Sequence, residues 1–203
     1  FKPHEYGDVI LPFTVLRRLD CTLESHKDEV YEIYEKYKGQ VDDPTPIILN
    51  KINTNFFNHS KYDLTRLKSD PQNINLNFQN YIGGYSDNVV EIIENFQFDK
   101  PVQKLHKSNR LYQLIDKFTE VDLHPDVISN RDMGIIFEEL LRKFSEMSNE
   151  TSGEHYTPRD IVRLLVSFVF EKDREELQGV GNVRSVYDPC CGSGGMLTIG
   201  EQY

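Results

Sequence analysis

Apolar residues recur every three to four positions near the start of the chain, from Val9 to Leu19. This spacing places them along one face of a helix. A second, charged stretch over 29–38 also has its apolar residues on one face and stops at Gly39, because glycine readily takes the left-handed conformation that ends helices. We therefore predict two packing helices, the second with its charges on a solvated face.

Residues 41–88 are rich in Asn, Asp, Pro, Ser and Gly, which favour turns and short elements. Aromatic residues recur through this region: Phe56, Phe57, Tyr62, Phe78, Tyr81 and Tyr85. Next to lysines and arginines such rings can stack on nucleic-acid bases. Aromatic residues under a loop-rich region more often form its small core. We favour the core interpretation and keep base stacking as the alternative.

Three further bundle helices are predicted from their apolar stripes. The stripes are Val89, Ile92, Ile93 and Phe96; then Leu111, Leu114, Ile115 and Phe118; and then Met133, Ile136, Phe137, Leu140, Leu141 and Phe144. Asn130 is placed to cap the last of these helices. Residues 1–148 should thus form a mainly helical domain, followed by a small polar linker at 148–153 and a second domain over 149–203.

The second domain opens with a strong helix-start signal. The hydroxyl group of Thr157 can cap the helix, and Pro158 is well tolerated at the first helical position. The negative charge of Asp160 can interact with the unpaired amide groups of the first turn. We predict a helix from there to about residue 171. Its apolar residues cover a wide arc, as expected for a helix lying against a sheet: Ile161, Val162, Leu164, Leu165, Phe168 and Val169.

A short β-branched run over 183–187 predicts a parallel-type strand that ends at Asp188. The glycine-rich stretch 190–195 follows, and another helix begins near Met196. Strand, acidic residue, glycine turn and helix together place a ligand at the carboxyl edge of a parallel sheet, over a helix amino terminus. A phosphate-cradling loop would need a lysine, and a dinucleotide turn would need a glycine at Leu197. Both are disfavoured here.

Composition narrows the range of functions. The chain has a net charge of -10, whereas domains that bind duplex DNA usually carry an excess of basic residues. We therefore predict that this chain does not form the main DNA-binding surface. Its three cysteines have no metal-ligand spacing, which predicts a reducing compartment and no metal site. Neither a secretory signal nor an apolar run of the roughly 18 to 20 residues that span a membrane is present. We therefore expect a cytoplasmic protein without membrane contact.

The stretch 188–195, Asp-Pro-Cys-Cys-Gly-Ser-Gly-Gly, resembles the first S-adenosylmethionine motif of amino-directed DNA methyltransferases, Asp-Pro-x-x-Gly-Ser/Thr-Gly. Residues 153–159, Gly-Glu-His-Tyr-Thr-Pro-Arg, resemble the Gly-x-x-Phe/Tyr-Thr-Pro-Arg segment of the modification (M) subunits of type I restriction-modification systems. Residues 6–19, 56–58, 81–86 and 132–140 resemble N-terminal landmarks of that family.

This resemblance implies a fold and a cofactor. The fold is a mainly α N-terminal domain followed by the beginning of an α/β, Rossmann-like, S-adenosylmethionine-dependent methyltransferase domain. The implied cofactor-binding residues are Glu154, His155, Tyr156, Thr157, Pro158, Asp188, Gly192, Ser193, Gly194 and Gly195. Of these, His155 would otherwise be interpreted as a surface histidine and Tyr156 as a packing aromatic.

The resemblance also implies an activity and partners. The M subunit transfers a methyl group to the exocyclic amino group of adenine in a specific DNA sequence. It acts in a complex with a specificity (S) subunit, a second M subunit and double-stranded DNA. Recognition of the DNA sequence by the S subunit is consistent with the negative net charge of this chain. The sequence leaves open the DNA site, the identity of the S subunit and the attachment of restriction (R) subunits.

One departure limits these implications. The family's catalytic segment, Asn-Pro-Pro followed by an aromatic residue, holds the flipped adenine, and no such run occurs before Tyr203. No catalytic residue is therefore assigned, and these 203 residues should be inactive alone. The alternative is a truncated module that binds assembly partners without methyltransferase activity. An RNA or protein methyltransferase shares the glycine turn but does not account for residues 153–159.

Overall fold

The computed structural model describes residues 3–147, 157–177, 185–192 and 194–201. It divides into two compact units, Phe1–Leu141 and Arg142–Tyr203. All regular elements in the described ranges are helices, apart from two isolated β-bridges in the first unit. No helix in these ranges is long and apolar enough to cross a membrane.

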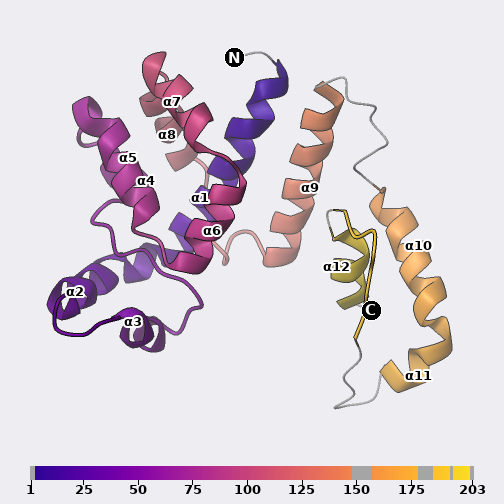
Figure 1. The fold of residues 1–203 in the computed structure, drawn as a ribbon. Helices are drawn as coiled ribbons and strands as arrows, with labels where there is room; N and C mark the ends of the chain where they lie inside the picture. Colours follow the sequence, from indigo (N-terminus) through magenta and orange to yellow (C-terminus); the bar gives the residue numbers. More distant parts are fainter. Residues whose placement is uncertain (1–2, 148–156, 178–184, 193, 202–203) are drawn as a thin grey trace. The chain divides into compact units, whose positions relative to one another are not determined.

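The first unit consists of short helices packed around α1 (Figure 1). In chain order they are η1 (Pro3–Tyr6), α1 (Gly7–Leu23), η2 (Glu24–His26), α2 (Lys27–Tyr37), α3 (Thr45–Ile52), α4 (Leu64–Leu67), η3 (Pro71–Asn73), α5 (Ile74–Gly83), α6 (Asp87–Asn95), α7 (Asp99–Lys107) and α8 (Leu111–Thr119). Helix α9 (Asn130–Met147) begins in the first unit and extends past its end at Leu141. The five helices predicted before residue 148 are all present. Gly39 has a φ of 77° just beyond α2, as its helix-ending role predicts.

Phe13 lies at the centre of the first unit. Its ring is fully buried, and it stacks on Phe78 at 5.6 Å and on Phe118 at 5.3 Å, with Phe98 edge-on at 5.2 Å. These rings come from four separate stretches of the chain, so one side chain of α1 joins them in a single core. Aromatic contacts of this geometry contribute beyond the burial of area alone.

The aromatic residues of 41–88 confirm the core interpretation. Phe57, Phe78, Tyr81 and Tyr85 are buried, and Phe56 and Tyr62 are partly buried against the same cluster. The region is also more helical than its turn-rich composition suggests, since it holds α3, α4 and α5. Core packing outweighs the weak local propensities of such residues.

The stripes of α6 and α9 are buried less than predicted. Val89 and Ile93 of α6 are buried, but Ile92 is 51% exposed. Successive helix residues lie about 100° apart, so a face centred on positions 89 and 93 leaves position 92 at its edge. The stripe of α9 is half-buried along its length, rather than inserted into the core.

The beginning of α9 corrects the predicted cap. Ser129 is the capping residue, because its Oγ accepts the N–H of Asp132 at 3.1 Å. The side chain of Asn130 instead accepts a hydrogen bond from Arg18 Nη2 at 2.6 Å. Arg18 also donates to two carbonyl groups in the preceding connection, so α1 fixes the path of the chain into α9.

The second unit contains α10 (Arg159–Phe170), η4 (Glu171–Asp173), α11 (Arg174–Leu177) and α12 (Gly195–Glu201). The predicted strand is not formed in its described part, because residues 185–187 have no regular secondary structure. Residues 183 and 184 lie outside the described ranges. A strand requires main-chain hydrogen bonds to a neighbouring strand, and the described residues supply none. The Rossmann-like sheet therefore stays a prediction.

Candidate functional site at the glycine turn

Helices α10 and α12 pack against each other through a small apolar cluster. Val162 and Val166 of α10 and Ile199 of α12 are buried, with Met196 and Phe170 packed at the edges. Two glycines on α12 allow this helix to lie close to α10. A Cβ at Gly195 would lie 3.7 Å from Val162 Cγ2, and a Cβ at Gly200 would lie 3.2 Å from the ring of Phe170.

These two contacts fix the direction of the helix pair. Gly195 begins α12 and lies near Val162 in the first turn of α10, whereas Gly200 near the end of α12 lies against Phe170 at the end of α10. The helices therefore run in the same direction, and their amino termini lie at the same end (Figure 1). Thr157 and Pro158, before α10, and the described residues of the glycine turn, before α12, therefore precede the same end of the helix pair.

The expectation that α10 lies against a sheet stays a prediction. Most of its apolar arc is exposed, up to 71% at Phe168: the exposed residues are Ile161, Leu164, Leu165, Phe168 and Val169. Only Val162 and Val166 are buried, and both face α12. Among the described residues there is no strand to cover the remainder.

The start of α10 also lies one residue later than predicted. Pro158, not Thr157, occupies the cap position, and its carbonyl accepts the N–H groups of Ile161 and Val162 at 2.9 and 3.0 Å. Thr157 lies outside the helix, and its side chain makes no capping hydrogen bond. Asp160 lies in the first turn as predicted.

The glycine turn is held by its own main chain and by Asp188. Asp188 Oδ1 accepts the N–H of Cys190 at 2.9 Å, and the carbonyl of Cys191 accepts the N–H of Gly194 at 2.7 Å. Gly192 and Gly194 have φ values of 51° and 79°, which favour glycine because other residues are strained there. Among the residues that the structure describes, no atom lies within 4 Å of a Cβ added at Gly194, so the main chain at this position borders open space between them.

Six of the ten predicted cofactor-binding residues can be placed. They are Thr157, Pro158, Asp188, Gly192, Gly194 and Gly195, which precede or begin the two parallel helices. The other four, Glu154, His155, Tyr156 and Ser193, lie outside the described residues. No group of three or more potential metal ligands occurs in the part of the chain that the structure describes.

Sequence reasoning missed a buried polar network in the first unit. Asp20 accepts hydrogen bonds from the Tyr81 hydroxyl at 3.2 Å and from the Leu64 N–H at 3.2 Å. Lys27 donates to Asn58 Oδ1 at 3.1 Å. Burial raises the pKa of Asp20 to about 6 and lowers the pKa of Lys27 to about 8. No local sequence pattern predicts such pairings, because they join positions far apart in the chain.

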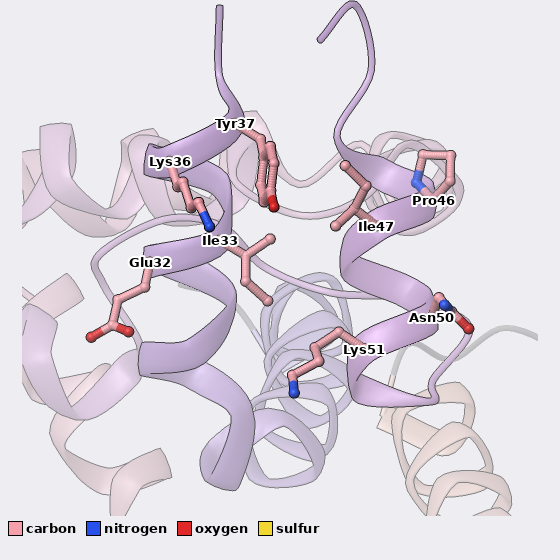
Figure 2. A pocket seen from close by; sticks show the side chains of 8 residues that line it. All are labelled: Glu32, Ile33, Lys36, Tyr37, Pro46, Ile47, Asn50 and Lys51. Atoms are coloured by element: carbon pink, nitrogen blue, oxygen red, sulfur yellow. The ribbon is translucent and has the colours of Figure 1, made fainter. Parts of the chain in front are cut away.

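An open groove of about 680 Å³ lies between α2 and α3. Figure 2 shows Ile33 and Tyr37 of α2 facing Ile47 of α3. Charged side chains at its edges include Glu32, Lys36 and Lys51. Lys51 also pairs with Glu29 at 3.5 Å. The groove has apolar walls and charges of both signs at its edges, and this arrangement indicates no particular chemistry.

Comparison with known families defines the class of protein. Residues 1–118 match the family model of the HsdM N-terminal domain, and residues 129–203 match the family model of N-6 DNA Methylase. The chain thus has a helical N-terminal region joined to the start of a DNA methylase. It belongs to the HsdM family, the methylase subunits of type I restriction enzymes.

Individual relatives agree with this assignment. The chain is 27% identical over 206 residues to the type I restriction enzyme MjaIX methylase subunit of Methanocaldococcus jannaschii, covering 96% of this chain and 35% of that protein. It is 34% identical over 87 residues to the EcoEI methylase subunit of Escherichia coli, covering 43% of this chain and 15% of that protein. The chain thus spans about a third of the length of the first relative. No solved structure matches.

Proposed function

We propose that the protein carrying this chain is a site-specific DNA adenine methyltransferase that uses S-adenosylmethionine. The transferred methyl group would go to the exocyclic amino group of adenine. One observation carries the proposal: the glycine turn before α12 lies at the same end of the helix pair as the start of α10. The two segments that resemble methyltransferase motifs are about thirty residues apart in the sequence, and the common direction of α10 and α12 supports the proposal that they form one pocket.

The residues at this end fit the cofactor. S-adenosylmethionine supplies an activated methyl group and presents a methionine end with an ammonium and a carboxylate. The amides at the start of α12 suit the carboxylate, because the first amides of a helix lack partners within the helix. Asp188 Oδ1 is held by Cys190, and this bond orients the carboxylate so that its other oxygen can accept from the ammonium.

The glycines supply access to the main chain. Because a Cβ at Gly194 would point into open space, the absence of side chains there lets a ligand approach the backbone closely. We propose that Glu154, His155, Tyr156 and Ser193 complete the pocket with Thr157, Pro158, Asp188, Gly192, Gly194 and Gly195. This part of the proposal rests on the family resemblance.

We further propose that the protein acts in the cytoplasm with an S subunit, a second M subunit and double-stranded DNA, with R subunits joining in restriction. The net charge of -10 supports the proposal that another subunit recognises the DNA. The domain boundary in the linker 148–153 stays a proposal, because the two compact units divide between Leu141 and Arg142, within α9.

Calorimetric titration with S-adenosylmethionine tests the proposal. Saturable binding of one cofactor per chain is expected. A well-folded protein without detectable binding would favour the alternative of a pure assembly module. Methyl transfer to duplex DNA, measured with labelled cofactor and an S subunit, tests the second step. The 203 residues alone should transfer no methyl group, because the Asn-Pro-Pro-aromatic segment does not occur in them.

A further inference from the structure

A cavity of about 530 Å³ lies between α5, α6 and α7 in the first unit. Apolar side chains form its walls, the first four of them buried and the other two partly buried: Phe78, Ile93, Phe98, Val102, Ile82 and Val90. Binding sites for small organic molecules have this size and walls of this kind. The cavity is therefore large enough and apolar enough to hold a small ligand.

The charged side chains that line this cavity are both acidic. Glu94 lies in the last turn of α6, and Asp99 begins α7. Among the described residues that line the cavity there is no lysine, arginine or histidine. The other polar side chains are Gln79 and Gln103, whose amide oxygens can accept hydrogen bonds. The described lining therefore offers negative charge and hydrogen-bond acceptors to a ligand.

The ends of the surrounding helices reinforce this negative charge. The last residues of α5, Ile82 and Gly83, line the cavity, as does the last turn of α6. A helix carries a partial negative charge at its carboxyl end, where cations are stabilised. The amino end of α7 has the opposite partial charge, but Asp99 lies there and offsets it. Two helix ends and two carboxylates therefore favour a cation in the cavity.

We propose that this cavity binds a small organic cation in which an aliphatic chain joins ammonium groups, as in a polyamine. The aliphatic chain contacts the apolar walls, and the ammonium groups pair with Glu94 and Asp99, which lie on separate helices. Ammonium–carboxylate pairs combine attraction between charges with hydrogen bonding. The site lies within the first unit, includes none of the residues proposed for S-adenosylmethionine, and goes beyond the proposed methyltransferase function.

Calorimetric titration with hexamethylenediamine tests both parts of this proposal. The probe should bind saturably, with one molecule per chain, at a fixed physiological salt concentration. Hexanediol has hydroxyl groups in place of the ammonium groups and should bind about tenfold more weakly, because charge-assisted hydrogen bonds are stronger than neutral ones. Ammonium chloride lacks the aliphatic chain and should not displace the probe. Equal binding of hexanediol would refute the preference for a cation, and displacement by ammonium would refute the role of the apolar walls.

Glu94→Gln tests where the diamine binds. Glu94 is exposed, and glutamine keeps the size of the side chain, so the fold should be retained while binding weakens about tenfold. Glu91→Gln is the matched control, because Glu91 is an exposed carboxylate on the same helix and is not among the residues that line the cavity. Both variants change the net charge by the same amount. A diffuse attraction to the acidic chain would therefore weaken equally in both.

Methyl resonances in nuclear magnetic resonance spectra locate the bound probe. Those of Ile93 and Val102 should shift during the titration, whereas those of Val166 and Ile199 in the second unit should not. Gly194→Asp should leave binding of the diamine unchanged, so a failure of the proposed cofactor site is measured separately from a failure here. The proposal is overturned by a lack of saturable binding, by equal losses in Glu94→Gln and Glu91→Gln, or by unshifted resonances at Ile93 and Val102.

Discussion

The hydroxyl of Tyr81 donates a hydrogen bond to Asp20 at 3.2 Å in the core of the first unit. Tyr81 also shares a hydrogen bond of 2.6 Å with the hydroxyl of Tyr85. Asp20 is buried, and loss of solvation together with the nearby Asp63 raises its pKa from 3.8 to about 6. A carboxyl group that is harder to ionise in the folded state makes stability depend on pH.

The sign of that dependence follows from proton binding. Between pH 3.8 and about 6 the folded protein holds a proton on Asp20 that the unfolded chain has lost. Stability contributed by this group is therefore present at low pH and lost as pH rises through about 6. Relative to Asp20→Asn, the wild-type free energy of unfolding should fall by about 3 kcal/mol across this window. Urea titrations of both proteins at pH 4 and pH 7 measure the difference, and an unchanged difference would refute it.

Phe13→Ala should be among the most damaging substitutions in the first unit. Phe13 is fully buried among three other rings, and its removal leaves a cavity that costs about 3 to 5 kcal/mol. Urea unfolding followed by circular dichroism measures the loss. Ile92→Ala is the matched control, because Ile92 is half exposed and its truncation should change stability by less than about 0.5 kcal/mol. Equal losses in the two variants would contradict the packing described.

Arg18→Lys should loosen the connection into α9. The guanidinium group donates to the carbonyls of Leu123 and Ile128 at 2.6 and 2.7 Å as well as to Asn130. A lysine ammonium cannot reproduce this planar fork, so a loss of about 2 kcal/mol is expected. Hydrogen exchange of the amides over 124–133 should become faster. The exposed Arg110 provides the control, and Arg110→Lys should leave those amides unchanged.

The sequence predicted those features that depend on local spacing. The helices that became α1, α2, α6, α8 and α9 were predicted because their apolar residues recur with the helical period. Helix α7 was missed because Val102 and Leu105 are its only buried apolar residues. Two such positions are too few to establish a period.

Features that depend on distant partners were not predictable in the same way. The network around Asp20 and Lys27 joins four segments of the first unit, and no local pattern marks those residues as buried. The run at 183–187 has strand composition, but a strand forms only beside another strand. In the candidate site, the motifs identified which residues to consider. The common direction of α10 and α12 required the structure.

The proposed division of labour predicts weak DNA binding by this protein alone. With a net charge of -10 in this chain, binding should be poor and unselective until an S subunit is added, because affinity for duplex DNA comes mainly from cationic contacts to phosphate. Gel-shift titration at a fixed salt concentration, with and without the S subunit, measures the effect. Nanomolar, sequence-selective binding without the partner would show that DNA recognition is not delegated.

Gly194→Asp should abolish binding of S-adenosylmethionine with little loss of fold. Gly194 has a φ of 79°, and a Cβ there meets no atom of the described residues within 4 Å, so we expect an added side chain to be accommodated by the fold. It would instead enter the proposed ligand space and repel the methionine carboxylate. We expect at least a hundredfold loss of affinity, about 2.7 kcal/mol, in calorimetric titration. Tyr156→Ala should weaken binding less, because it would remove only the wall proposed for Tyr156 and leave the amides in place.

The matched control for Gly194→Asp is Gly39→Asp. Gly39 has nearly the same φ of 77°, and a Cβ there also meets no atom within 4 Å. Both substitutions therefore impose a similar backbone strain of about 1 kcal/mol, but only Gly194 belongs to the glycine turn. Melting curves should shift alike for the two variants, whereas cofactor affinity should fall only for Gly194→Asp. Near-normal affinity in a well-folded Gly194→Asp protein would mean that the cofactor binds elsewhere. An equal loss of cofactor affinity in Gly39→Asp would mean that backbone strain, rather than the position of Gly194, causes the effect.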